Sequence, residues 1–145
     1  MSDWNLPSGD FRGKIVKVHD GDTVTVLQRD GSLANVRLAN IDAPELMQQG
    51  GTASRDRLRD LIYGRDLNVA ATPDTTYGRA VGTLLDRNAT NYNLGQVRSG
   101  NASAYEQFLR DPAALQAQAE AAAAKAGFWA TGGPPDAAAF RHAQP

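Results

Sequence analysis

The sequence has no cysteine, only two histidines and no excess of charge of either sign. Without cysteine there is neither a disulfide nor a thiolate metal site, so any bound metal ion must be held by oxygen or histidine ligands. Fifteen Lys and Arg residues against sixteen Asp and Glu residues give a net charge of −1. This balance argues against binding of nucleic acid through bulk charge, so any such binding would have to be local.

Long apolar runs are also missing from the start of the chain. The first twenty residues include Asp3, Asp10 and several polar residues but no continuous apolar stretch, so we expect no signal peptide or membrane span there. The chain is then either cytoplasmic as it stands or the mature form of an exported protein. With 145 residues, of which 41% are hydrophobic, it has enough apolar material for one core. We therefore expect a single compact domain.

The first half of the chain has the two-residue periodicity of β-strands. Apolar and polar residues alternate in short runs that are separated by turn sequences such as Asp20-Gly21-Asp22 and Asp30-Gly31. A further turn is predicted at Thr72-Pro73-Asp74-Thr75. The predicted strands cover residues 13–19, 23–27, 33–41, 67–71 and 80–85.

Helical patterns lie between the third and fourth strands and in the second half. Leu58, Leu61 and Ile62 fall on one face of a predicted amphipathic helix at 52–63, and two more helices are predicted at 91–99 and 111–126. The Pro- and Gly-rich residues after Trp129 are expected to be loosely ordered. Together these elements predict an α+β fold with a five-stranded, partly open OB-fold β-barrel and three α-helices. We assign 1–12 to an extension, 13–130 to the domain and 131–145 to a tail.

Three short stretches place carboxylates and arginines near predicted strand ends. They are Asp20-Gly21-Asp22-Thr23, Arg37-Leu-Ala-Asn-Ile-Asp42-Ala43-Pro44-Glu45 and Tyr77-Gly78-Arg79. A hard divalent cation binds several oxygen ligands, so a fold that joins the strand ends with Asp22 and Asp42 would form part of a metal site. Glu45, next to a metal-bound phosphate, could orient or deprotonate an attacking water, and two arginines could stabilise charge on phosphate oxygens. This combination predicts cleavage of a phosphodiester beside a metal ion.

The order of these motifs resembles the staphylococcal nuclease (thermonuclease) family from about residue 13 to residue 129. Besides the three stretches, Val97-Arg-Ser-Gly100 leading to Tyr105 and Gly127-Phe-Trp129 are similar to later landmarks of that family. The resemblance implies a nonspecific nuclease that uses calcium, ahead of magnesium or manganese. It further implies a monomer that cuts DNA and RNA, preferably single-stranded, and leaves 3′-phosphate ends.

The same resemblance implies roles for individual residues. Asp22, Asp42 and the backbone carbonyl of Ala43 would bind the metal, although the family's usual threonine is absent at position 43, and Asp20 would support them. Catalytic roles fall to Arg37, Glu45 and Arg79. The phosphate contacts fall to Tyr77 and Tyr105. His19 and His142 receive no catalytic role.

Each motif has a plainer interpretation when it is taken alone. Asp20-Gly21-Asp22 could be only a hairpin turn, and Arg37 with Glu45 could be a surface ion pair. For the whole chain, the alternatives are a noncatalytic nucleic-acid or protein binding module on the same barrel and an oligosaccharide or peptide binder. The loop 46–51 lacks lysine and Thr75-Thr76 carries no charge, so we expect weaker and more salt-sensitive substrate binding than in basic relatives, with the chemical step retained.

Overall fold

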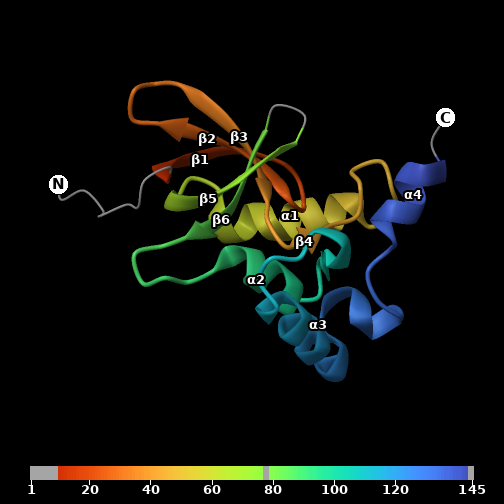
Figure 1. Ribbon diagram of the computed structural model, residues 1–145. Helices are drawn as coiled ribbons and strands as arrows, with labels where there is room; N and C mark the ends of the chain where they lie inside the picture. The colour runs from red at the N-terminus through yellow and green to blue at the C-terminus, as the bar shows by residue number, and fades with distance from the viewer. Residues whose placement is uncertain (1–9, 77–78, 144–145) are drawn as a thin grey trace.

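Five strands curve into a barrel (Figure 1), and their buried apolar residues belong to one core. The computed structural model describes residues 10–76 and 79–143. The strands form a closed barrel in the order β1-β2-β3-β6-β5, which confirms the predicted OB-fold barrel and shows that it is closed. Their bounds are β1 Phe11–Asp20, β2 Thr23–Gln28, β3 Leu33–Leu38, β5 Asp66–Thr76 and β6 Arg79–Leu85.

Strand register brings three of the predicted motifs together at one region of the barrel. β1, β2 and β3 run antiparallel, and Thr23 at the start of β2 pairs with Arg37 near the end of β3. β3 then pairs in parallel with β6, where Arg37 lies opposite Val81. Because these pairs are adjacent, the turn between β1 and β2, the end of β3 and the start of β6 are neighbours.

The helices lie outside the barrel (Figure 1). Helix α1 packs against β1, and α2 packs against α3. β4, which lies between β3 and β5 in the chain, pairs with β7 in a two-stranded sheet separate from the barrel. Among the described residues, no helix is both long and apolar enough to cross a membrane. The bounds are β4 Ile41–Asp42, α1 Gly51–Ile62, α2 Tyr92–Arg98, β7 Ser103–Ala104, η1 Glu106–Phe108, α3 Ala113–Ala124, η2 Gly127–Thr131 and α4 Ala137–Ala143.

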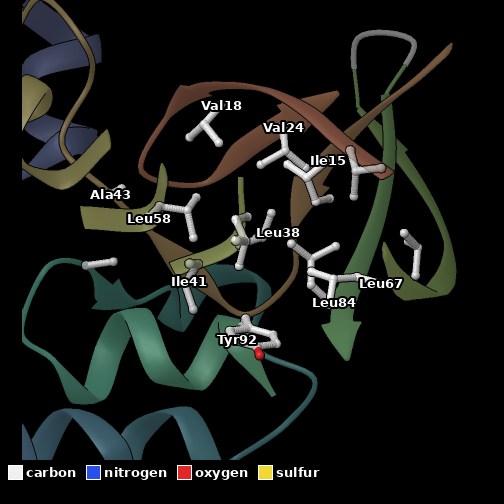
Figure 2. Close-up of a cluster of buried hydrophobic side chains, with 14 of the residues drawn as sticks. Ile15, Val18, Val24, Leu38, Ile41, Ala43, Leu58, Leu67, Leu84 and Tyr92 are labelled. Atoms are coloured by element: carbon white, nitrogen blue, oxygen red, sulfur yellow. The ribbon is translucent and has the colours of Figure 1, made fainter. Parts of the chain in front are cut away.

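One apolar core joins the barrel to the helices beside it. Figure 2 shows Ile15, Val24 and Leu38 from the barrel near Leu58 of α1 and Ile41 of β4. These side chains are fully buried, with 0% of their surface exposed. Burial of each such side chain contributes about 1.5 to 3 kcal/mol, so this core fixes the backbone that carries the motifs.

Two strands end more than two residues away from the predicted position. The turn expected at residues 72–75 is wrong, because β5 continues through Thr76 and takes up the additional residues as an irregularity between Ala71 and Thr75. The strand expected at residues 33–41 is interrupted, because Asn40 adopts a left-handed backbone with φ 71°. Asp42 therefore lies on the separate strand β4, which pairs with β7.

The end of the chain also differs from the prediction. The sequence predicts loosely ordered residues after Trp129 and three helices, but these residues form the end of η2 and a fourth helix, α4. The side chain of Asp136 accepts a 2.9 Å hydrogen bond from the N–H of Ala139, which satisfies a backbone donor at the start of α4. Ala137 is buried, so α4 packs onto the rest of the molecule.

Candidate active site

The turn between β1 and β2 holds Asp22 in a buried position. Its N–H donates a 3.0 Å hydrogen bond to the carboxylate of Asp20, and its carbonyl accepts one of 2.7 Å from the N–H of Leu38. The amide of the buried Gln96 donates to the carbonyl of Gly21 at 3.2 Å and to that of Ser54 in α1 at 3.0 Å. The turn is thus fixed from both sides, and Asp20 supports the backbone of Asp22.

Arg37 joins the two aspartates that were predicted to bind metal. Its Nη2 lies 3.3 Å from Oδ2 of Asp22 and 3.2 Å from Oδ1 of Asp42. Its Nη1 donates to the carbonyls of Leu38 and Ile41 at 2.7 and 2.8 Å. Two carboxylates from separate strands therefore converge on one nitrogen. The plainer alternative of an Arg37–Glu45 ion pair does not describe this site, since Arg37 pairs with the aspartates and Glu45 pairs with Arg141.

Burial makes this pair of carboxylates costly to ionise. Desolvation raises the pKa of Asp22 from 3.8 to about 7, against the opposing effect of Arg37. Desolvation also raises the pKa of Asp42, although hydrogen bonds from Arg141 and the charge of Arg37 act in the other direction. A cation bound between the two carboxylates would offset this cost, so the electrostatics favour a positive ligand at this point.

The oxygen atoms of both aspartates are of the ligand type that a hard metal ion prefers. A carboxylate has about four acceptor positions, and described residues make four polar contacts with Asp22 and three with Asp42. Asp22 is contacted by the hydroxyl of Thr23, the N–H of Ala43 and Arg37, at 3.1, 2.8 and 3.3 Å, and by the side chain of Asp20. Asp42 is contacted once by Arg37 and twice by Arg141, at 3.2, 3.2 and 3.1 Å. Asp42 thus keeps one acceptor position, and a ligand of Asp22 would replace one of its present contacts.

The remaining ligands of such an ion would not be side-chain carboxylates or histidines. Within residues 10–76 and 79–143, no group of three or more Asp, Glu or His side chains is arranged to hold a metal. Ala43 is buried directly against Asp22, with 2% of its surface exposed, so its backbone is close to the site. Calcium and magnesium accept backbone carbonyls, water and phosphate oxygens as ligands, so two carboxylates fit such an ion.

Glu45 lies at the edge of the same site with an unexpected partner. Its Oε1 is 2.6 Å from Nη1 of Arg141 in α4, and Arg141 also contacts both carboxylate oxygens of Asp42. The hydrogen bonds to Asp42 and Glu45 hold the pKa of Arg141 above its ordinary value. The sequence carried no signal for this contact, because a single arginine in a Pro- and Gly-rich tail has no distinctive spacing.

Six of the predicted residues border a pocket of about 590 Å³, namely Asp20, Asp22, Arg37, Glu45, Arg79 and Tyr105, whereas Asp42 and Ala43 are not part of its wall. Arg79 reaches into this region and its Nη1 donates to the hydroxyl of Thr23 at 3.4 Å. The ring of Tyr105 lies 5.4 Å from the guanidinium carbon of Arg37 and 5.0 Å from the ring of Phe108. Tyr77 lies outside the described residues. Side chains that carry charge or aromatic rings in the pocket wall are Asp20, Asp22, Arg37, Glu45, Arg79, Tyr105, Phe108, Arg110 and Arg141.

Three charged or aromatic side chains of this wall were not predicted from the sequence, namely Phe108, Arg110 and Arg141. Phe108 is 67% exposed, and its position beside Tyr105 follows from the short helix η1 rather than from a sequence motif. The backbone N–H of Arg110 donates to the side chain of Asn40 at 2.7 Å, which joins this segment to the loop before β4. The pocket wall does not include either histidine. His19 bonds Thr25 at 2.7 Å, and burial lowers its pKa.

Comparison with known proteins relates the chain to nucleases. A family model described as Staphylococcal nuclease homologue matches residues 35–131. An Escherichia coli protein named "Uncharacterized endonuclease" is 35% identical over 139 residues, which cover 96% of this chain and 90% of that protein. A Haemophilus influenzae protein of the same name is 38% identical over 88% of this chain and 71% of its own length. A Shigella flexneri protein named "Micrococcal nuclease" is 35% identical over 83% and 74%.

Proposed function

The chain belongs to the staphylococcal nuclease family and is a nuclease, and from this premise we propose that Asp22 and Asp42 hold a calcium ion beside which it cuts DNA and RNA. The observation that carries the proposal is the convergence of both carboxylates on one nitrogen of Arg37, at 3.3 and 3.2 Å. Their burial, and the raised pKa of Asp22, favour a cation at the same point.

The metal would be held by few protein ligands. Asp22, Asp42 and the carbonyl of Ala43 supply oxygen atoms, and substrate phosphate and water complete the coordination. A site with so few fixed ligands suits calcium, which accepts irregular geometry, better than magnesium or manganese. Once bound, the ion would supply positive charge to a phosphoryl oxygen and make nearby water more acidic.

Glu45 has the role of orienting or deprotonating the attacking water. Its side chain is 32% exposed and lines the pocket, where a water and a phosphate group can both approach it. As the water oxygen bonds to phosphorus, Glu45 accepts a proton and the bond to the 5′ oxygen breaks, which leaves a 3′-phosphate end. The 5′ oxygen leaves with a proton from solvent.

Arg37 and Arg79 are assigned to the phosphate group in this proposal. Both line the pocket from adjacent strands, β3 and β6. Their planar guanidinium groups can donate two hydrogen bonds each and stabilise the charge that grows on phosphate oxygens in the transition state. In the structure Arg37 contacts carboxylates, so phosphate binding requires it to redistribute its hydrogen bonds when the metal enters.

Single-stranded DNA and RNA are the proposed substrates, and the chain acts as a monomer. Tyr105 and Phe108 present aromatic rings beside the arginines, and such rings stack on unpaired bases. The net charge of −1 supplies little general attraction for polynucleotides, so binding depends on the local arginines. This supports weak binding that salt weakens further.

The test is cleavage of heat-denatured DNA with calcium, with magnesium or with chelator. The full chain is compared with Glu45→Gln and Arg37→Ala, and with Asp56→Asn as a control, because Asp56 is an exposed partner of Arg55 on α1. We expect calcium-dependent cutting by the full chain and by the control, with both site variants slower by about a hundredfold or more. End-group analysis of the products should find 3′-phosphate.

Other outcomes would assign the chain differently. Equal cutting in chelator and in calcium would contradict the metal site, and full activity of Glu45→Gln would contradict the role of Glu45. DNA that stays intact in every lane, with binding still measurable, would support a noncatalytic binding module. Thermal unfolding of each variant shows whether a loss of activity follows from a loss of folded protein.

A further inference from the structure

The C-terminal helix α4 contributes a side chain to the active site. Arg141 contacts Glu45 through one hydrogen bond of 2.6 Å and Asp42 through two of 3.2 and 3.1 Å. Its guanidinium therefore bridges the residue proposed to act on water and a residue proposed to bind metal. Charge-assisted, bidentate contacts of this kind fix the orientation of both partners.

A second contact ties α4 to the loop that carries Glu45. The side chain of Gln48 accepts a 3.0 Å hydrogen bond from the N–H of Glu45 and donates one of 3.1 Å to the carbonyl of Asp136, directly before α4. The N–H of Gln48 also donates to the carbonyl of Glu45 at 2.9 Å. The backbone and the side chain of Glu45 are thus both connected to the same C-terminal segment.

Arg141 forms part of the pocket wall and leaves the pocket open. The space of about 590 Å³ exists with Arg141 in its lining. Described residues make three contacts with Asp42, so one of its about four acceptor positions stays available, and the proposal keeps Arg141 in place when the metal binds. The guanidinium carbon of Arg141 also lies 5.9 Å from the centre of the Tyr105 ring, which helps to hold it in place.

We propose that Arg141 is a positioning residue of the nuclease site, through which α4 holds the carboxylate of Glu45 beside Asp42. This inference rests on the proposed function, because it takes Glu45 as the group that acts on water. Glu45 has three rotatable side-chain bonds and is partly exposed, so without its partner the carboxylate would sample other positions. A displacement of about 1 Å in such a group can cost about a hundredfold in rate.

The experiment measures kcat and KM of the full chain on a single-stranded oligonucleotide with calcium. Arg141→Gln is expected to lower kcat by about 10- to 100-fold with little change in KM. Arg141→Lys should recover part of this loss, since an ammonium group can still pair with Glu45 but cannot bridge two carboxylates in the same way. Arg98→Gln is the matched control, because Arg98 is exposed and pairs with Glu120 at 3.6 Å. The control should retain its rate.

A double variant tests whether Arg141 acts through Glu45. If it does, Glu45→Gln with Arg141→Gln should be no more than about twofold slower than Glu45→Gln alone, because the partner is already lost. Additive losses would overturn the proposal and assign Arg141 a separate role. A raised KM with unchanged kcat would indicate a phosphate contact, and a faster Arg141→Gln enzyme would indicate an inhibitory latch; either result would overturn positioning.

Hydrogen exchange gives a measurement that does not depend on activity. Arg141→Gln is expected to increase amide exchange in residues 43–50, relative to the full chain and to Arg98→Gln, because the loop loses a tether to α4. Unchanged exchange there would overturn the proposal whether or not the chain cleaves DNA. Increased exchange together with full activity of Glu45→Gln would support the contact between α4 and the loop. It would refute only the role of Glu45 in the proposed function.

Discussion

Substitution of Gly21 by alanine should damage both the stability and the metal site of the chain. Gly21 lies between Asp20 and Asp22 in the buried turn, and a Cβ added there would overlap Oγ of Ser54. It would also lie 2.6 Å from Cβ of Ala43 and 3.0 Å from Cβ of Ser54, closer than ordinary contact. Ser54 belongs to α1 and Ala43 to the segment after Asp42, so relief of the overlap must move the surroundings of Asp22.

The size of the effect follows from this overlap. Overpacking a buried position costs about 1 to 3 kcal/mol. For a chain of this length, 1 kcal/mol corresponds to about 2 to 4 °C in Tm, so Gly21→Ala should lower Tm by roughly 2 to 12 °C. Affinity for calcium should fall as well, because Asp22 moves with the turn.

Gly95 supplies the matched control for this substitution. It lies in α2, and a Cβ at that position meets nothing within 4 Å. Gly95→Ala is therefore expected to stabilise the chain by about 0.5 to 1 kcal/mol, since alanine restricts the unfolded backbone and favours helix. Gly21→Ala should therefore lower the stability of the chain and Gly95→Ala should raise it. This difference separates the effect of steric overlap from a general effect of replacing glycine by alanine.

Thermal unfolding, followed by circular dichroism in chelator, is the assay. Ser54→Ala removes the hydroxyl that the new methyl group would overlap, so the double variant should be more stable than the sum of the single effects by at least about 0.5 kcal/mol. Ser54→Ala alone is destabilising, because its hydroxyl donates to the carbonyl of Asn101 at 2.7 Å. An unchanged Tm for Gly21→Ala, or strict additivity in the double variant, would refute the reasoning.

Three further predictions concern charge. The pKa of Asp22, about 7 when folded against 3.8 as the ordinary value, means that the metal-free folded state binds the extra proton, so stability from this group falls as pH rises from about 4 to about 7. Asp22→Asn should flatten that part of the pH dependence of Tm measured in chelator; an unchanged slope would contradict the assignment. Binding of labelled single-stranded DNA by Glu45→Gln with calcium should weaken about tenfold between about 50 and 200 mM salt, as two or three arginine contacts require, and unchanged binding over this range would contradict local binding through few arginines. Arg79→Ala should slow cleavage by about a hundredfold, with Arg79→Lys recovering only part because lysine lacks the planar fork, and equal rates for lysine and arginine would argue against bidentate phosphate contact.

The parts of the fold that the sequence predicted depend on local patterns. Alternation of apolar residues identifies the barrel strands, and turn residues such as Asp30-Gly31 mark the connection between β2 and β3. The strand boundaries that were predicted wrongly depend on tertiary contacts. Pro73 and Asp74 suggest a turn, yet pairing with β6 extends β5 through Thr76. The pairing of Ile41 with Ala104 in β4 and β7 joins segments far apart in sequence and has no local signal.

The candidate site also combines residues that local motifs predict with a residue that only tertiary packing brings there. Asp22, Arg37 and Asp42 occur in compact motifs that point to phosphate and metal chemistry, and the fold brings all three into contact. Arg141 is 96 residues from Glu45 and 99 from Asp42, so its participation depends on how the C-terminal segment packs. Nothing in the spacing of a lone arginine predicts such a contact.

Calcium titration of the metal-free chain by calorimetry tests the central claim most directly, namely that Asp22 and Asp42 together hold the ion. We predict one calcium ion per full chain, affinity at least about tenfold weaker for both Asp22→Asn and Asp42→Asn, and unchanged affinity for the control Asp56→Asn. Equal affinity for the full chain and for both site variants, with all of them folded, would contradict the account.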